Sequence, residues 1–257
     1  MLEKILLQFI LLFVFSPVLH AYDNFLLENC EEYIKYGVPG QDGTLLCRKG
    51  YLLAHDSERK TPIWVAEHLI NKRVTGVVKR TNFQPDPDLN IGKRAELIDY
   101  RGSGYDRGHM APAGNMRWDQ QAMLESFFLS NIVPQIGKDM NQGIWKELEE
   151  KIRLWAISRG ELYIYTGPIY AKKPPDVIGI NKVAIPTHLY KIIYDPIAIE
   201  AIAFIMPNMK LKSSDMPAYI VTIREIEKKT GLNFLSALDT ETESIVELVK
   251  ARNLWTE

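Results

Sequence analysis

The stretch 105–116, Tyr-Asp-Arg-Gly-His-Met-Ala-Pro-Ala-Gly-Asn-Met, constrains this chain more than any other. It places Asp106, Arg107 and His109 within four residues, so an acid, a guanidinium and an imidazole lie close together. Gly108 lets the backbone pass close to a bulky neighbour, and the proline that follows the histidine cannot continue a helix. These features are typical of a functional site.

The chemistry of these side chains suits catalysis on a phosphate. A carboxylate beside a histidine can fix the tautomer and orientation of the ring, which leaves the other ring nitrogen free as a base. An arginine offers a planar fork to phosphate oxygens. Taken alone, an Asp-x-x-His pattern is more often a charged turn with a histidine in solvent. The longer set of motifs described below favours the site.

Composition bounds the class of protein. The 257 residues are 46% hydrophobic and 25% charged, as in an ordinary globular protein, which predicts one domain or one with a small appendage. The formal net charge of −1 provides no overall field that attracts nucleic acid, so a site for a polyanion must depend on a local patch. Residues 72–117 form such a patch, because nine Lys and Arg against five Asp and Glu leave a net +4 there.

The N-terminus has the pattern of a secretory signal. Lys4 precedes an apolar run from residue 5 to 15, and Leu19-His20-Ala21 ends in a small residue. This predicts cleavage after Ala21, leaving a mature domain of residues 22–257 that is secreted or periplasmic and no longer touches a membrane. The alternative is an uncleaved anchor, but the run is shorter than the roughly 20 apolar residues of a membrane-spanning helix.

The chain has two cysteines, Cys30 and Cys47. In an exported protein an even pair predicts one disulfide that closes a short loop. The alternative is two free thiols in a reducing compartment, against which the signal pattern argues. Neither cysteine belongs to a CxxC or metal-binding pattern, so we assign no chemistry to them.

Local patterns predict alternating strands and helices. Strands are expected within 45–51, at 62–69, 161–166, 183–194 and 197–206, the last two as a hairpin. Helices are expected at 119–130 with Asp119 as N-cap, from Asn141 to about Ser158 before Gly160, and twice near the C-terminus. The first of the C-terminal helices has a capping box at Thr222 and ends at Gly231. Loops are expected at 81–92 and 131–135.

Several polar residues are better explained by structure than by chemistry. The Asp86-x-Asp88 pair lacks the further oxygen ligands of a calcium loop, so a solvated turn is the preferred interpretation. His68 lies inside a predicted strand and is expected to be a packed core histidine rather than a metal ligand. His55 and His188 are isolated, and we expect structural roles for them.

The predicted helix that begins at Asn141 carries a second group of functional candidates. At about 100° per residue, Glu149 lies roughly 80° and Arg153 roughly 120° around the helix from Asn141, so all three share one broad face. A neutral oxygen, a carboxylate for metal-bound water and an arginine for phosphate suit Mg²⁺, which keeps most of its own waters. The alternative is a solvated helix face on which Glu149 and Arg153 form a plain i,i+4 ion pair.

These motifs together resemble the DNA/RNA non-specific endonucleases, the ββα-metal group that includes secreted bacterial nucleases and mitochondrial endonuclease G. The residues that carry the resemblance are Asp-Arg-Gly-His at 106–109, Asn-Gln-Gly-Ile-Trp at 141–145, Leu148-Glu149 and Arg153. Similar segments follow the family order at 64–69, 80–83 and 225–232, so the resemblance covers roughly residues 45 to 235. One departure is Gly114, where many members have alanine.

The resemblance implies a role for each candidate. His109 would be the general base, oriented by Asp106 or by a backbone carbonyl. Asn141 would be the one direct protein ligand of Mg²⁺, with Mn²⁺ as a substitute, and Glu149 would hold the water shell of the cation. The arginines that would neutralise charge on the phosphate are Arg80, Arg107 and Arg153, of which Arg80 is placed less securely.

The fold implied by the resemblance is α+β, with a central, mostly antiparallel sheet, packed helices and a ββα-metal active-site motif. The implied function is a Mg²⁺-dependent, sugar-non-specific endonuclease that acts on DNA and RNA, with a homodimer as one option for its assembly. A different class of answer is a catalytically silent nucleic-acid-binding protein on the same fold. A zinc hydrolase would need an HExxH motif or a Cys/His cluster, and the sequence has neither.

Overall fold

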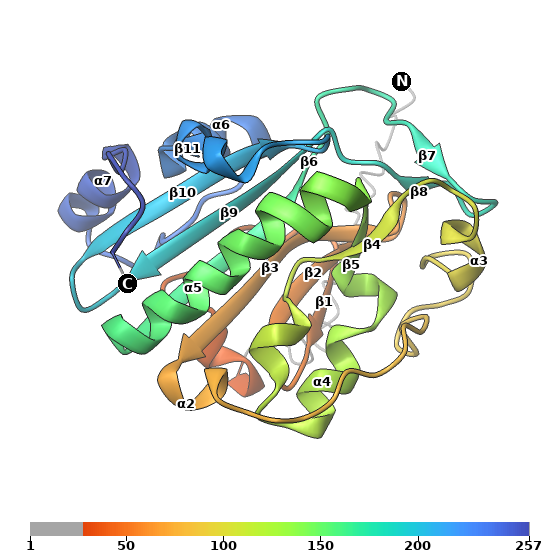
Figure 1. Ribbon diagram of the computed structural model, residues 1–257, viewed down its shortest axis with the longest axis horizontal. Helices are drawn as coiled ribbons and strands as arrows, with labels where there is room; N and C mark the ends of the chain where they lie inside the picture. The colour runs from red at the N-terminus through yellow and green to blue at the C-terminus, as the bar shows by residue number, and fades with distance from the viewer. Residues whose placement is uncertain (1–27, 257) are drawn as a thin grey trace, which may run out of the picture.

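The computed structural model describes residues 28–256. In it, the strand predicted at 62–69 forms β3 (Thr61–Ile70). The predicted signal segment lies outside the described residues. β3 belongs to a seven-stranded sheet in which every pairing is antiparallel (Figure 1). The order across this sheet is β1 (Thr44–Cys47), β2 (Leu52–Asp56), β3, β6 (Glu161–Ile169), β9 (His188–Asp195), β10 (Glu200–Pro207) and β11 (Ile220–Val221). The expected α+β class with an antiparallel central sheet is confirmed.

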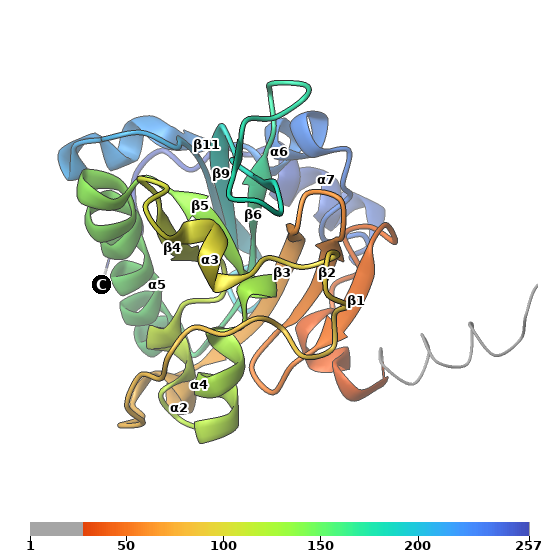
Figure 2. The same cartoon turned by 90° about the vertical axis from the view of Figure 1, so that its right-hand side faces the viewer.

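Both faces of the sheet are covered, because successive side chains along a strand point to opposite sides. On β2, Leu52 and Leu53 belong to two different buried clusters, and on β3 Trp64 and Val65 divide in the same way. One face packs against α4 (Gln120–Ser126) and α5 (Trp145–Arg159), and the other against α6 (Ile223–Thr230) and α7 (Thr240–Leu248). Figure 2 shows these two helix layers on either side of the sheet.

The predicted helix boundaries are confirmed where a capping residue marks them. The Asp119 carboxylate accepts a hydrogen bond from the N–H of Ala122 at the start of α4, and Gly160 ends α5. The capping box at Thr222 opens α6, and Gly231 ends it with a φ of +75°. The helix predicted at 119–130 is too long, since α4 ends at Ser126. The prediction overran because the apolar residues continue beyond the end of the helix. In the described part of the chain, no helix is long and apolar enough to span a membrane.

A separate two-stranded ladder pairs β4 (Asp106–His109) with β5 (Ile132–Gln135). The prediction of a loop at 131–135 is therefore wrong. The strand was not predicted because Pro134 has no backbone N–H, and a proline argues against a central strand. β5 pairs with a single neighbour, so the proline is accommodated opposite Arg107 without breaking the ladder.

The remaining elements are short. The strand predicted at 183–194 is divided into two. Residues 183–184 pair with β7, and the central sheet includes only the part from residue 188 onward. These short elements are β7 (Val177–Ile178), β8 (Val183–Ala184), α2 (Asn71–Val74), α3 (Leu97–Tyr100), the 3-10 turns η1 (Glu31–Tyr33), η2 (Ala113–Met116), η3 (Leu129–Asn131) and η5 (Ser213–Tyr219), and the irregular turn η4 (Gly137–Ile144).

The predicted disulfide between Cys30 and Cys47 is present, with the two Cα atoms 5.9 Å apart. It joins the residue before η1 to the end of β1. The bond therefore ties the N-terminal segment to the edge strand of the central sheet.

Asp86 corrects the prediction of a solvated turn. Its carboxylate is fully buried and accepts two hydrogen bonds of 2.7 Å from Arg48, together with one from the Ser130 hydroxyl. Asp88 stays exposed beside the same arginine. The pattern Asp86-x-Asp88 could not reveal this, because Arg48 lies 38 residues earlier in the chain. The ion pair anchors the loop that carries Phe83 into the cleft described below.

The three isolated histidines have packed positions. His68 stacks on Tyr163 with ring centroids 4.4 Å apart, and its Nε2 lies 2.9 Å from a carboxylate oxygen of Glu161. His188 is partly buried beside the Thr187 hydroxyl. His55 is fully buried on β2, and neither of its ring nitrogens has a hydrogen-bond partner within residues 28–256.

His55 should make the stability of the fold depend on pH. Burial lowers the pKa of His55 to about 4, whereas the unfolded chain takes up the proton near 6.5. The neutral ring therefore stabilises the fold fully above about pH 6.5, and this contribution is lost as the pH falls toward 4. Between pH 7.5 and 4.5 we expect the loss to be about 2 to 3 kcal/mol.

Denaturant unfolding of the wild type and of His55→Leu at both pH values would measure this contribution. Other buried groups titrate in both proteins, so the relevant quantity is the difference between the two pH slopes. The leucine variant should lose less stability on acidification than the wild type. Equal slopes would show that His55 carries no such penalty.

Candidate active site

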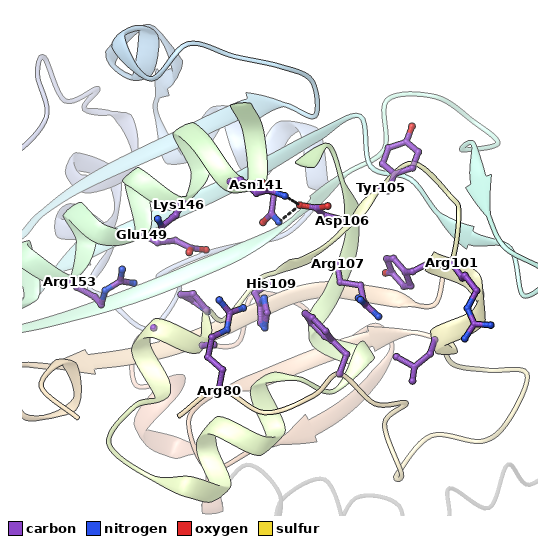
Figure 3. A pocket seen from close by; sticks show the side chains of 17 residues that line it. Arg80, Arg101, Tyr105, Asp106, Arg107, His109, Asn141, Lys146, Glu149 and Arg153 are labelled. Carbon is purple, nitrogen blue, oxygen red and sulfur yellow. Dashed lines mark hydrogen bonds between the residues drawn. The ribbon is translucent and has the colours of Figure 1, made fainter. Parts of the chain in front are cut away.

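A cleft of about 1020 Å³ opens between β4, α3 and the N-terminal half of α5. Figure 3 shows Glu149 and Arg153 extending from α5 toward the space around His109, which Arg80 and Arg107 flank. The structure thus brings together all of the residues predicted from the sequence as a site. The predicted residues that line this cleft are Arg80, Asp106, Arg107, His109, Asn141, Glu149 and Arg153.

Gly108 sets how closely β4 approaches β5. A Cβ atom built on Gly108 would lie 2.0 Å from Oε1 and 2.7 Å from Cβ of Gln135, so a larger residue would push the two strands apart. The expected close backbone approach at this glycine is confirmed. It fixes the position of His109, the next residue along β4.

His109 lies at the end of β4 with only 9% of its surface exposed. Its ring packs between Phe83 and Phe127, with centroid distances of 5.2 and 4.9 Å. Burial, helped by the nearby charge of Arg80, lowers the pKa of His109 to about 3. The imidazole is therefore neutral at physiological pH. Its Nε2 has no hydrogen-bond partner among the described residues, so the ring is free to accept a proton.

Asn131 holds the backbone that follows His109, and the sequence analysis did not find it. Its side-chain oxygen accepts a hydrogen bond of 2.9 Å from the N–H of Ala111. Its amide nitrogen donates to the carbonyl oxygens of Ala111 and Ser126, both at 2.9 Å. This buried asparagine therefore ties β4 to the end of α4. The one sequence signal that could have indicated this role is a polar residue directly before the apolar pair Ile132-Val133.

Asp106 has a different neighbour from the one expected. Its Oδ2 accepts hydrogen bonds from the Asn141 amide at 3.0 Å and from the Gln142 amide at 2.7 Å (Figure 3). Of the two groups expected to orient His109, Asp106 or a backbone carbonyl, the first is therefore corrected. The physical reason is the period of a strand, because residues three apart on β4 point to opposite faces. Asp106 instead orients the side chain of Asn141.

Asn141 does not lie on a regular helix, which corrects the angular argument made from the sequence. It belongs to η4, where Asp139 has a φ of +67° and Gly143 has φ and ψ of −117° and −114°. The regular helix α5 begins only at Trp145. A rotation of 100° per residue therefore does not relate Asn141 to Glu149, although both side chains reach the same cleft.

The donor atoms at this end of the cleft fit a hydrated divalent cation. The hydrogen bond to Asp106 occupies the amide nitrogen of Asn141, which leaves its Oδ1 available to a metal. Burial raises the pKa of Glu149 to about 7 against the opposing effects of Lys191 and Arg153, and a bound cation would favour the ionised carboxylate. Oxygen donors of this kind suit Mg²⁺. Residues 28–256 contain no group of three or more His, Cys, Asp or Glu placed to hold a metal.

Three arginines supply positive charge in the cleft. The Arg80 guanidinium lies 5.4 Å from the centroid of the Phe127 ring, and that of Arg107 lies 4.6 Å from the Phe83 ring. Arg153 donates to the side-chain oxygen of Asn115 at 3.3 Å, not to Glu149 as in a plain i,i+4 pair. Within the described range, none of the three forms an ion pair with a carboxylate, so their charge is available to an anion.

Comparison with known proteins agrees with this geometry. Residues 30–241 match the family model of the DNA/RNA non-specific endonucleases. Human mitochondrial endonuclease G is 36% identical over an alignment of 219 residues, and the match covers 79% of this chain and 73% of that protein. Nuclease C1 of Cunninghamella echinulata var. echinulata is 35% identical over an alignment of 230 residues, and the match covers 83% of this chain and 91% of that protein.

A solved structure extends the likeness to three dimensions. The chain matches a crystal structure of the EndoG/EndoGI complex, described as showing the mechanism of EndoG inhibition, with a TM-score of 0.79 and 33% identity. The match covers 83% of this chain and 94% of that one. On this evidence, the chain belongs to the family of DNA/RNA non-specific endonucleases, enzymes that hydrolyse nucleic acids.

Proposed function

We propose that this protein is a Mg²⁺-dependent endonuclease that cleaves the phosphodiester bonds of both DNA and RNA, with His109 as its general base. The observation that carries the proposal is the neutral, buried imidazole, whose Nε2 has no partner in the part of the chain that the structure describes. It lines the same cleft as the Asn141 amide and the three arginines, which form no ion pairs within residues 28–256. A base, a donor for a hard cation and charge for a phosphate are the parts that hydrolysis of a phosphodiester requires.

His109 would accept the proton of the attacking water. Packing between Phe83 and Phe127 holds the ring in place, and the Asn131 side chain fixes the backbone beyond it. Because its pKa is low, the ring is in the proton-accepting form throughout the neutral range. A positioned general base contributes about 10²- to 10⁴-fold to the rate of such a reaction.

Asn141 Oδ1 would be the one direct protein ligand of the cation, Mg²⁺ with Mn²⁺ as a substitute, and the Glu149 carboxylate would hold its water shell. The cation would supply stabilisation of negative charge on the phosphate and the leaving oxygen. Asp106 contributes by holding the Asn141 amide in one orientation. The side chains at this end therefore divide the work between binding the cation and keeping its binding atom aligned.

Sequence-independent cleavage of both nucleic acids follows from the kinds of group in the cleft. Arginines and a metal site recognise phosphate oxygens, which every nucleotide carries, and phosphate contacts hold no sequence information. The three arginines would neutralise the additional charge that develops on the phosphate during attack. Neither contribution requires a 2′-hydroxyl or a particular base.

We also propose that the protein acts after export, in the periplasm or outside the cell. The secretory pattern ending at Ala21 supports this, as does the disulfide between Cys30 and Cys47, since such bonds persist in oxidising compartments. Several relatives, including the human protein, are named as mitochondrial. Export would distinguish this chain from those relatives.

The purified protein should nick supercoiled plasmid and degrade structured RNA in Mg²⁺, and excess EDTA should abolish both activities. Gel electrophoresis with and without the chelator measures this directly. A silent binding protein would shift the mobility of the plasmid without cutting it, and undiminished cleavage in EDTA would refute the metal assignment.

Replacing His109 with alanine should lower turnover by about 10²- to 10⁴-fold while leaving substrate affinity nearly unchanged, because the variant lacks only the proton acceptor. Initial rates on plasmid, with circular dichroism to verify folding, would test this. A folded variant that cleaves within a few-fold of the wild type would place the base elsewhere. His188→Ala is a matched control, since that histidine is packed outside the cleft lining.

Asp106→Ala should raise the Mg²⁺ concentration needed for half-maximal activity by about 10- to 100-fold, because the Asn141 amide loses the partner that orients it. Excess Mg²⁺ should restore most of the activity of this variant. Asn141→Ala lacks the ligand itself, so Mg²⁺ should restore at most part of its activity. Titrations of rate against Mg²⁺ would compare the two, and an unchanged requirement in Asp106→Ala would argue that Asp106 orients something else.

A further inference from the structure

We propose that Asn115 is a positioning residue, fixed by the buried carboxylate of Glu67, that aims the Arg153 guanidinium into the cleft. The inference rests on the proposed function, in which Arg153 neutralises charge on the phosphate. It concerns residues behind the cleft, since neither Glu67 nor Asn115 is among those that line it. The structure joins the three side chains in a line from the central strand β3 to the cleft.

Arg153 depends on Asn115 for its orientation. Its Nη1 donates to Asn115 Oδ1 at 3.3 Å, and this is the hydrogen bond that the described structure gives its guanidinium. Asn115 lies in η2, six residues after His109, and only 3% of its surface is exposed. A partner so deeply buried cannot follow a mobile arginine, so it holds the guanidinium in one place.

Glu67 determines which end of the Asn115 amide faces Arg153. The amide nitrogen of Asn115 donates to Glu67 Oε2 at 3.0 Å, and Glu67 lies on β3 with 2% of its surface exposed. Burial raises the pKa of Glu67 to about 7, while Lys191 and the hydrogen bond from Asn115 favour its ionised form. The ionised carboxylate only accepts hydrogen bonds, so it pairs with the NH₂ end of the amide and leaves the oxygen end for the guanidinium. The opposite orientation would bring two sets of donors together at Arg153.

Gly114 provides a second observation that the Arg153 guanidinium has a defined position. A Cβ atom at this position would lie 2.6 Å from Nη1 and 3.0 Å from Cζ of Arg153. The missing side chain therefore lets the guanidinium rest against the backbone beside Asn115.

A fixed guanidinium matters for the chemistry because Arg153 has a competing partner. Glu149 lies four residues earlier on α5, at the spacing of an i,i+4 ion pair, and an arginine paired there would lose much of its charge to the carboxylate. Asn115 is neutral, so it orients the guanidinium without cancelling its charge. Preorganised charge of this kind acts mainly in the transition state, so its loss lowers kcat more than it raises KM.

A double-mutant cycle on the full protein tests the inference, with plasmid cleavage in saturating Mg²⁺ as the assay. Asn115→Ala should lower kcat about 10- to 100-fold with KM within about threefold of the wild type. In an Arg153→Ala background the same change should cost less than about twofold, because the side chain that Asn115 positions is already absent. If the fold-losses in kcat of the two single variants multiply in the double variant, Asn115 acts independently of Arg153 and the inference is overturned.

Three further variants keep the test decisive if Asn115→Ala folds poorly. Gly114→Ala should lower kcat in the wild type and have no effect in the Arg153→Ala background, since the three atoms nearest its new methyl group all belong to the guanidinium. Glu67→Gln keeps a side-chain oxygen for the Asn115 amide and should retain activity within a few-fold, whereas Glu67→Leu should behave like Asn115→Ala. A Gly114→Ala loss that persists without Arg153 would contradict the inference.

The outcomes separate this inference from the proposed function. A wild-type protein that does not cleave plasmid in Mg²⁺ would refute the proposed function itself. If the wild type cleaves and Arg153→Ala lowers kcat, but Asn115→Ala leaves kcat unchanged, the endonuclease assignment stands and only the positioning role fails.

Discussion

The pairing of β4 with β5 is the contact on which the cleft depends. It requires Gly108, because any Cβ there would collide with Gln135, and it sets His109 at the end of the ladder. From that position the ring packs against Phe83 and Phe127 and is neutral. Asp106, at the other end of the same strand, holds Asn141. A four-residue strand thus places both the proposed base and the residue that orients the proposed metal ligand.

Charge in the cleft is arranged so that cations are available and carboxylates are few. Phenyl rings lie beside Arg80 and Arg107, and a neutral amide holds Arg153, so no ion pair with a described residue cancels their positive charges. Of the two carboxylates used for alignment, Asp106 lines the cleft and Glu67 lies behind it. Asp106 holds an amide and Glu67 holds another, each through a hydrogen bond from a side-chain NH₂ group. Both arrangements use a carboxylate to fix a neutral side chain that in turn presents its oxygen.

Much of the fold and the membership of the site followed from local patterns. Caps at Asp119, Thr222 and Gly231 marked helix ends because the chemistry that stops a helix is local. The disulfide followed from an even pair of cysteines in a chain with a secretory pattern. Features that depended on distant partners were missed or misjudged. Asp86 was expected in solvent, yet it is buried because Arg48 pairs with it across 38 residues.

The sequence by itself determined the family and indicated which residues meet in the cleft, since the spacing of acid, guanidinium, glycine and imidazole at 106–109 and the motifs around Asn141 carry that resemblance. Only the tertiary structure decided which of them act on one another. Asp106 orients Asn141 rather than His109, η4 departs from helical geometry before α5, and Asn115 and Asn131 serve as anchors. The physical reason is that residue types and their spacing can be read along the chain. Which side chains form a hydrogen bond depends instead on the strand faces, turns and contacts that bring distant segments together.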